Sequence, residues 1–331
     1  MIYIGLLIIA VGAFCQSSSY VPINKVRDWS WESYWLIQGI AAWVVFPLIG
    51  AMLAVPAGHT LRELFASDMH ATLMTMFYGM LWGIGGLTFG LSMRYLGVAL
   101  GQSISLGTCA ALGTILAPLF TGHAADLTSS VITGVVITLV GIGVIGTAGM
   151  MRQKDNADQA QKVKYNFGKG ITVAVLAGFM SACFNIGLAQ GADLHFEGVS
   201  PMLSSLPATL LVTLGGFITN LCYCLYQNKR NRTFGDYKKG SVWLNNLMFC
   251  ILAGALWYSQ FFGLSIGKGF LNDSPTLTTF AFCILMALNI VFSNVWGIIL
   301  KEWKGSGRKT VITLISGLII LIISCFIPQL I

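Results

Sequence analysis

The chain contains 331 residues, of which 56% are apolar and only 9% are Asp, Glu, Lys or Arg. Soluble domains carry about 25% charged residues, so the 19 basic and 12 acidic residues are too few to cover a globule of this size. This composition excludes a cytosolic enzyme, a disordered chain and a secreted disulfide scaffold, and it argues against nucleic-acid binding as the reason for the net charge of +7. It predicts an integral membrane protein built of many helices.

Ten runs of about 20 apolar residues predict ten transmembrane helices, so the expected fold class is all-α integral membrane. In chain order the runs lie near residues 2–20, 34–54, 71–93, 98–119, 130–149, 170–190, 203–226, 242–266, 276–300 and 310–328. The first run lacks a preceding basic segment and a small-x-small cleavage site, so we interpret it as a membrane helix and not as a signal peptide.

The eight cysteines all fall within these apolar runs, and none has the CxxC or Cys/His spacing of a metal site. We interpret them as small packing residues. The sequence therefore predicts neither a metal site nor a cofactor.

The distribution of Lys and Arg predicts the orientation in the membrane. The loops after the first, third, fifth, seventh and ninth runs hold 17 of the 19 basic residues, and the opposite side holds only Arg62 and Lys268. Because loops rich in Lys and Arg stay in the cytoplasm, both termini are expected in the periplasm. The basic loops are expected to contact anionic membrane lipids, and no nucleic acid partner is expected.

Short internal matches indicate that the chain is duplicated. We predict a first five-helix repeat over residues 1–150, a cytoplasmic basic linker over 151–169 and a second five-helix repeat over 170–331. Because each repeat has an odd number of helices, the two would be inverted relative to each other. Inverted repeats enclose a cavity that opens alternately to the two sides of the membrane, which is typical of transporters. The matches are Val131-Ile132-Thr133 with Val311-Ile312-Thr313, and Leu81-Trp82 with Leu256-Trp257.

The polar residues within the predicted spans are neutral, because no Asp, Glu, Lys or His lies near the middle of any span. Amides, hydroxyls and aromatic rings suit a neutral polyhydroxyl ligand, since sugar hydroxyls pair with amides and apolar sugar faces stack on Trp or Tyr. A dicarboxylate or a nucleotide would need Arg or Lys at this depth. A membrane glycosyl- or prenyltransferase would need clustered acids such as DxD or DDxxD, and the sequence contains neither motif.

The clearest candidate binding face lies on the eighth span, where Trp257, Gln260 and Phe261 recur at helical spacing. Trp82 in the third span lies near mid-depth. Packing alone is the alternative interpretation of the aromatic residues. The predicted substrate-binding residues are Trp82, Trp257, Tyr258, Gln260, Phe261, Gln102 and Asn185.

A second group of residues comprises candidates for gating the substrate path and for coupling transport to an ion. Glu32 lies at the cytoplasmic mouth of the second span, where it could pair with Arg94. Asn220 and Asn246 lie nearer the cytoplasmic ends of their spans, where they serve either as interhelical hydrogen bonds or as gate elements. Asp273 lies outside the membrane, before the ninth span.

Nine segments spread along the chain form a further pattern. They are Tyr20-x-Pro22-x-x-Lys25-Val26, Trp29-Ser30-Trp31-Glu32, Trp82-Gly83-Ile84-Gly85, Gly90-Leu91, Met93-Arg94-Tyr95-Leu96-Gly97, Gly113-Thr114 with Pro118, Leu206-Pro207 with Gly215, Gly216 and Asn220, Trp257-Tyr258-x-Gln260-Phe261-Phe262, and Lys301-Glu302-Trp303. In these segments and in their order the chain resembles the L-rhamnose–proton symporters of the drug/metabolite transporter superfamily. The resemblance implies a ten-helix inverted-repeat fold, an inner-membrane location and uptake of a neutral 6-deoxyhexose, L-rhamnose, coupled to protons.

One segment departs from this resemblance. In the enterobacterial members an acidic residue lies just inside the ninth span, whereas the stretch from Lys268 to Phe282 places Asp273 outside it. The residue that carries the proton is therefore left open. The alternatives are sodium-coupled or facilitated transport, export, and transport of another sugar or small metabolite.

Overall fold

The computed structural model describes residues 1–96, 98–155 and 167–330, and every regular element within these ranges is helical. Nine helices in these ranges are long and apolar enough to cross a membrane. They are Ile2–Ile23, Trp31–Leu53, Met69–Leu96, Leu100–Phe120, Ser129–Asp155, Gly168–Gln190, Leu206–Asn231, Gly240–Leu271 and Pro275–Ile299. Each overlaps one of the predicted runs, which confirms an all-α integral membrane protein.

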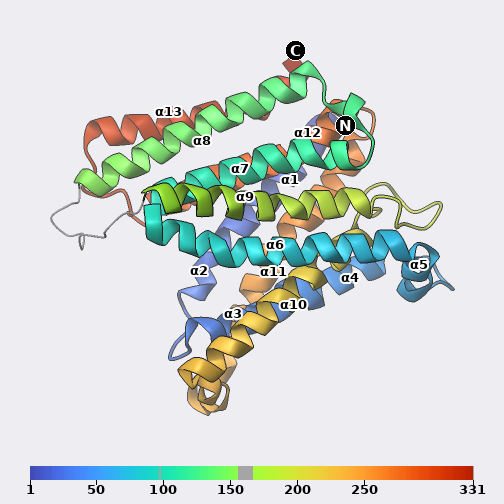
Figure 1. Ribbon diagram of the computed structural model, residues 1–331, viewed down its shortest axis with the longest axis horizontal. Helices are drawn as coiled ribbons and strands as arrows, with labels where there is room; N and C mark the ends of the chain where they lie inside the picture. Colours follow the sequence, from blue (N-terminus) through green and yellow to red (C-terminus); the bar gives the residue numbers. More distant parts are fainter. Residues whose placement is uncertain (97, 156–166, 331) are drawn as a thin grey trace. The chain divides into compact units, whose positions relative to one another are not determined.

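The labelled helices are seen in Figure 1. In chain order the elements are α1 (Ile2–Ser18), α2 (Tyr20–Ile23), α3 (Trp31–Ile40), the π-helical turn η1 (Ala41–Val45), α4 (Phe46–Leu53), α5 (Leu61–Ser67), α6 (Met69–Leu96), α7 (Val98–Phe120), the 3₁₀ turn η2 (Ala124–Asp126), α8 (Ser129–Asp155), α9 (Phe167–Gln190), α10 (Leu206–Asn231), the 3₁₀ turn η4 (Thr233–Lys238), α11 (Gly240–Leu271), α12 (Pro275–Ile299), α13 (Arg308–Ser324) and α14 (Ile327–Leu330).

The chain divides into two compact units, and each combines two separated segments of the sequence. The first unit comprises Met1–Gly83 and Gly187–Asn272, so it holds α1 to α5, the first half of α6, α10, η4 and α11. The second comprises Ile84–Ile186 and Asp273–Ile331, and it holds the rest of α6, α7, α8, most of α9 and α12 to α14. These units describe compactness, so the predicted repeats over 1–150 and 170–331 stay a prediction about ancestry.

Small residues let α1 and α11 approach each other closely in the first unit. A Cβ atom at Gly12 would lie 2.9 Å from the carbonyl oxygen of Ser259, and one at Gly5 would lie 2.8 Å from the carbonyl oxygen of Gly267. Only glycine permits this approach of the two backbones, and small residues are usual at helix interfaces in membranes. The contact holds α11, and with it Trp257, against the first helix.

The π-helical turn η1 interrupts the second span between α3 and α4. Its hydrogen bond runs from the N–H of Phe46 to the carbonyl oxygen of Ala41, five residues earlier. Pro47 follows directly. Proline has no N–H for the carbonyl of Trp43, and its ring would clash with that carbonyl in an α-helix, so the backbone widens before it. The predicted span over 34–54 is correct in extent but contains this turn, which the apolar pattern does not indicate.

In the second unit α8 and α13 lie side by side (Figure 1). A Cβ atom at Gly141 would lie 2.7 Å from a methyl carbon of Leu321, and the hydroxyl of Thr138 donates a 3.0 Å hydrogen bond to the hydroxyl of Ser324. α7 packs on both α8 and α12. The tenth predicted run thus forms α13, a helix of 17 residues held firmly to its neighbour.

Several helices differ from the predicted pattern in extent or presence, and α11 and α5 are two examples. α11 has 32 residues and ends at Leu271, whereas the predicted span ended at 266. Lys268 lies inside the helix because a single charged residue does not end one, and α11 continues to the Asn272 that precedes α12. α5 lies within a predicted loop and begins with a capping box, in which the hydroxyl of Thr60 accepts from the N–H of Glu63 and the Glu63 carboxylate accepts from the N–H of Thr60. This T-x-x-E pattern is a visible helix-start signal.

Candidate functional site

Trp82 and Trp257, the two tryptophans singled out in the sequence, are neighbours in the first unit. Their ring centroids lie 5.8 Å apart with the ring planes inclined by 35°. Trp82 comes from α6 and Trp257 from α11, and both side chains are only partly buried. Phe261, one turn after Trp257, packs edge-to-face on it with centroids 5.3 Å apart. Three of the predicted binding residues therefore meet in one place.

Three further tryptophans extend this arrangement. Trp43 of η1 meets Trp82 and Trp257 edge-to-face at centroid distances of 6.0 and 5.8 Å. Trp35 lies 5.7 Å from Trp43, and Trp31 stacks on Trp35 at 5.4 Å. The series runs from Trp31, which is 41% exposed, to Trp43, which is 4% exposed. We name these six residues the aromatic cluster: Trp31, Trp35, Trp43, Trp82, Trp257 and Phe261.

Gly216 of α10 makes room for one member of the aromatic cluster. A Cβ atom at Gly216 would collide with the six-membered ring of Trp82. The backbones of α6 and α10 also lie close together here, because a Cβ atom at Gly83 would lie 2.8 Å from the carbonyl oxygen of Gly216. The position of the Trp82 ring thus depends on the absence of a side chain on the neighbouring helix.

Asn220 holds a second member of the aromatic cluster. Its Oδ1 atom accepts a 3.1 Å hydrogen bond from Nε1 of Trp35. Its Nδ2 atom donates to the carbonyl oxygens of Gly216 at 2.9 Å and Gly83 at 3.5 Å. The side chain is 4% exposed. This predicted gate candidate links α3, α6 and α10 in the manner of an interhelical hydrogen bond.

The other candidates on α11 are more deeply buried than Trp257. Gln260 is 3% exposed, and its Nε2 atom donates a 3.1 Å hydrogen bond to the carbonyl oxygen of Trp257. Tyr258 is 5% exposed, and a Cβ atom at Gly50 would collide with its hydroxyl oxygen, so this hydroxyl lies against α4. It has no hydrogen-bond partner among the residues described. Trp257 is therefore the most accessible of the predicted binding residues on this stretch of α11.

Four predicted site residues belong to the second unit. Gln102 is half-buried on α7. Asn185 of α9 is 6% exposed and donates a 2.8 Å hydrogen bond to the carbonyl oxygen of Gly113, which ties α9 to α7. Arg94, in the last turn of α6, and Asp273, just before α12, are exposed.

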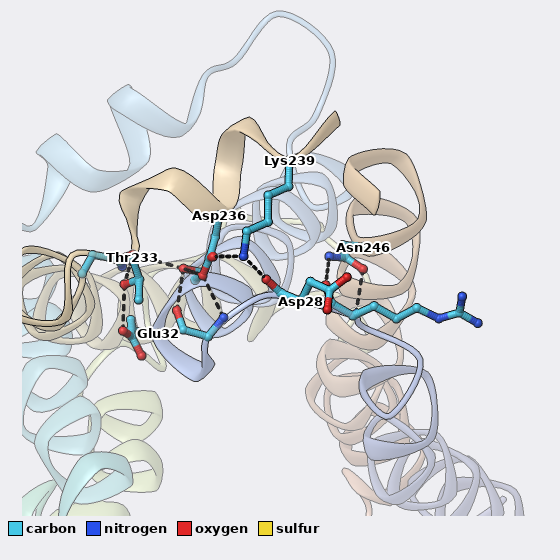
Figure 2. Close-up of polar contacts among 10 residues, drawn as sticks. Asp28, Glu32, Thr233, Asp236, Lys239 and Asn246 are labelled. Atoms are coloured by element: carbon cyan, nitrogen blue, oxygen red, sulfur yellow. Dashed lines mark hydrogen bonds and ion pairs between the residues drawn. The ribbon is translucent and has the colours of Figure 1, made fainter. Parts of the chain in front are cut away.

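A polar cluster surrounds the start of α3 in the first unit (Figure 2). Glu32 is 5% exposed, and its Oε1 atom accepts hydrogen bonds from Nδ2 of Asn231 at 3.0 Å and from Oγ1 of Thr233 at 2.8 Å. Both partners are uncharged. Within residues 1–96, 98–155 and 167–330, no ion pair to Glu32 is present. Glu32 is thus a buried carboxylate held by neutral donors.

Asp236 of η4 lies in the same cluster but has a cationic partner (Figure 2). Its Oδ1 atom forms a 2.7 Å ion pair with Nζ of Lys239. Its Oδ2 atom accepts from the N–H of Ser30 at 2.8 Å and from the hydroxyl of Ser33 at 2.9 Å. Burial raises the pKa of the Asp236 carboxyl, but the bonds from Lys239, Ser30 and Ser33 outweigh burial and lower this pKa to about 2. Asp236 is therefore ionised at neutral pH and fastens η4 to the start of α3.

Asn246 binds the loop between α2 and α3 to α11. Its Nδ2 atom donates to the carbonyl oxygen of Arg27 at 2.7 Å, and its Oδ1 atom accepts from the N–H of Arg27 at 3.0 Å. Lys239 also donates to the carbonyl oxygen of Asp28 (Figure 2). Asn246 is fully buried. Asn246, a predicted gate candidate, thus holds this loop in place with two hydrogen bonds to the backbone of one residue.

The sequence patterns missed Trp35 and Trp43. The spacing of Trp31 and Trp35, four residues apart on one helix face, was a usable signal. Trp43 carried no such signal, because the π-helical turn shifts the helical phase between it and Trp35. Only the packing of α3, η1, α6 and α11 brings these residues together.

Comparison with known proteins identifies the family. The sequence model of the L-rhamnose-proton symport protein (RhaT) family matches residues 1–330. This chain belongs to the RhaT family. The L-rhamnose-proton symporter of Mannheimia succiniciproducens is 30% identical over 337 aligned positions, covering 98% of this chain and 96% of that relative. The L-rhamnose-proton symporters of Citrobacter koseri and Escherichia coli are each 29% identical, covering 95% of this chain and 93% of theirs.

Membership of the RhaT family decides several expectations. The resemblance read from the nine sequence segments is confirmed. The family transports a sugar with protons, so the chain is a transporter and not an enzyme. With its long apolar helices, it is a multi-pass protein of the bacterial inner membrane.

Proposed function

We propose that the protein imports L-rhamnose together with protons across the bacterial inner membrane, as a secondary transporter that works by alternating access. The observation that carries the proposal is the aromatic cluster, found in a chain of the RhaT family. The relatives named above are L-rhamnose-proton symporters. Family and cluster together indicate the sugar class and the energy source.

The aromatic cluster suits a 6-deoxyhexose for a chemical reason. Such a sugar carries a methyl group where most hexoses carry a hydroxymethyl group, so more of its surface is apolar. Indole faces pack well on C–H and methyl groups. Trp82 and Trp257, partly buried with ring centroids 5.8 Å apart, are the proposed contact surfaces for the sugar ring.

Polar side chains are proposed to bind the sugar hydroxyls. The amide of Gln260 donates to the carbonyl oxygen of Trp257 and that of Asn185 to the carbonyl oxygen of Gly113, so a bond from either amide to the sugar would replace one of these bonds. The hydroxyl of Tyr258 has no hydrogen-bond partner among the described residues, and the sugar would supply one. Gln102 is half-buried and carries both a donor and an acceptor. Phe261 would add an apolar edge beside Trp257.

The proposed topology has ten spans in two inverted repeats, with both termini in the periplasm. α13 would be the tenth span, since its 17 residues lie at the short end of the usual range of about 17–25. The 17 to 2 distribution of basic residues supports the orientation. It also supports contact between the basic loops and anionic lipids.

Glu32 is the proposed proton carrier. A coupling group must change its protonation during transport, and a permanent ion pair opposes that change. Glu32 is buried among neutral donors. Asp236 is paired with Lys239, and Asp273 is exposed. Glu32 is therefore the buried carboxylate of the first unit whose charge is held by no cation among the described residues.

Uptake into proteoliposomes tests the function. With labelled L-rhamnose outside, an imposed inward proton gradient is expected to drive accumulation above equilibrium, and an uncoupler is expected to abolish it. Accumulation that ignores the proton gradient and follows a sodium gradient would contradict proton coupling. A panel of unlabelled hexoses as competitors tests the sugar.

The role of Glu32 is tested with Glu32→Gln. This variant keeps the hydrogen-bond acceptor but cannot carry a proton. Exchange of labelled for unlabelled L-rhamnose is expected to persist, while accumulation driven by the proton gradient is lost. Asp273→Asn, at an exposed position, is the matched control and should retain both activities. Full accumulation by Glu32→Gln would remove Glu32 from the coupling mechanism.

A further inference from the structure

The indole N–H of Trp43 is a buried donor that finds no acceptor in the described part of the chain. Trp43 is 4% exposed, and its Nε1 atom has no hydrogen-bond partner among the residues described. Burying a polar group without a partner is unfavourable, and most buried donors in native proteins are paired. The N–H of Trp43 therefore requires an explanation.

The position of Trp43 gives that explanation. Its ring meets the two proposed sugar-contact surfaces, Trp82 and Trp257, at interplanar angles of 88° and 83°. Because the Trp43 ring is nearly perpendicular to both neighbours, it presents its edge where Trp82 and Trp257 present their faces. Neither neighbouring indole can accept a conventional hydrogen bond, since an indole nitrogen is a donor only.

The backbone holds Trp43 in this place. The residue sits in the π-helical turn that Pro47 imposes. A Cβ atom at Gly39 would lie 2.7 Å from the Trp43 ring, so the ring packs directly on that glycine. π-helical turns occur frequently at functional sites. The ring is thus held by its own helix as well as by its aromatic neighbours.

We infer that Trp43 is a sugar-binding and specificity-determining residue, whose indole N–H donates to one hydroxyl oxygen of the bound sugar while Trp82 and Trp257 contact its apolar surfaces. The inference rests on the proposed function and deepens it. A 6-deoxyhexose has no C6 hydroxyl, so its orientation depends on the hydroxyls of the ring. A single hydrogen-bond donor held in place among apolar surfaces favours the sugar that has a hydroxyl oxygen within hydrogen-bond distance of it.

Two other tryptophans of the first unit sharpen the comparison. Trp35 uses its N–H in the bond to Asn220. Trp29, like Trp43, has a buried Nε1 atom without a partner among residues 1–96, 98–155 and 167–330, but its ring packs edge-to-face on Tyr237, which is not part of the aromatic cluster. Trp29 is therefore a matched control for the loss of an unpaired indole N–H.

The experiment compares Trp43→Phe with Trp29→Phe in the purified full-length protein. Phenylalanine keeps an aromatic ring and removes the N–H. Calorimetric titration with L-rhamnose is expected to show binding weakened about 3- to 10-fold in Trp43→Phe, the effect of one hydrogen bond, and unchanged in Trp29→Phe. The same titrations with the 2-, 3- and 4-deoxy analogues of L-rhamnose identify the hydroxyl, because the analogue that lacks it should bind wild type and Trp43→Phe equally.

Three results would overturn the inference. Equal affinity of wild type and Trp43→Phe for L-rhamnose would show that the N–H makes no bond to sugar. Equal weakening for L-rhamnose and every analogue would show that the N–H acts only on the neighbouring rings. Wild-type protein that binds no L-rhamnose would overturn the proposed function itself, whereas the first two results leave that function intact.

A second variant covers the case in which Trp43→Phe does not fold. Pro47→Ala removes the cause of the π-helical turn and leaves the indole in place. It is expected to weaken L-rhamnose binding and to reduce discrimination among the same analogues. Unchanged discrimination in a folded Pro47→Ala protein would contradict the role assigned to the turn.

Discussion

The indole N–H of Trp35 donates a 3.1 Å hydrogen bond to the amide oxygen of Asn220. The same amide donates to the backbone of Gly216, the glycine on which the Trp82 ring packs. One asparagine on α10 therefore connects two separated members of the aromatic cluster. Polar groups inside a membrane bundle bind helices together, and here that link also fixes the rings.

Replacing Asn220 with alanine should destabilise the first unit. The substitution leaves the N–H of the half-buried Trp35 without its acceptor Asn220, at an expected cost of about 1–3 kcal/mol in the free energy of unfolding. Denaturation in SDS measures this cost. In the double variant with Trp35→Phe the loss should be smaller than the sum of the single effects, because both changes remove the same bond. Strict additivity would show that this bond contributes nothing.

Gly216→Ala should displace the Trp82 ring. The new methyl group would collide with that ring, and overpacking of this kind costs about 1–3 kcal/mol. Binding of L-rhamnose, measured by calorimetry, should weaken with it. Gly90→Ala on α6 is the control, because a Cβ atom there meets nothing within 4 Å. If both variants bind sugar as wild type does, the position of the ring is not needed for binding.

Asp236 predicts a stability difference that depends on pH. Its pKa of about 2 lies below the ordinary value of 3.8, so the carboxylate stabilises the folded protein fully above about pH 4, and this contribution disappears as the pH falls toward 2. At about 1.4 kcal/mol per pKa unit, it amounts to roughly 2 kcal/mol. The thermal unfolding temperature of Asp236→Asn should be lower than that of wild type from pH 5 to 8, and the difference between the two temperatures should become smaller below pH 4. A gap that stays constant down to pH 3 would refute this assignment.

Asn246→Ala should free the loop between α2 and α3. Its two bonds to the backbone of Arg27 hold a segment in which trypsin can cut after Lys25 and Arg27. Proteolysis of a backbone held by hydrogen bonds requires local opening, so cleavage at these sites should accelerate several-fold. Asn272→Ala, at an exposed position beyond the end of α11, is the control. Equal cleavage rates would show that other contacts fix the loop.

The apolar pattern was sufficient for the membrane helices, because the hydrocarbon core demands about 20 apolar residues whatever the neighbours are. The apolar pattern was insufficient where a helix extends beyond its apolar stretch, as α11 extends past Lys268. Trp82, Trp257 and Phe261 could be chosen from residue type and spacing, since large aromatic side chains dominate packing and binding contacts. Their meeting with Trp43 could not be predicted, because it depends on how η1, α6 and α11 pack together.

By itself the sequence determined that this protein lies in a membrane, which loops carry its positive charge and which neutral and aromatic residues stand inside its spans. Those properties follow from local composition, because the cost of placing each side chain in the bilayer depends mainly on that side chain. Only the tertiary structure decided that Glu32 is buried among neutral donors while Asp236 has a lysine partner, and that Asn220 and Asn246 bind backbone and indole groups. Burial and hydrogen-bond partners come from segments distant in the chain, so a carboxylate or an amide acquires its role only when those segments meet.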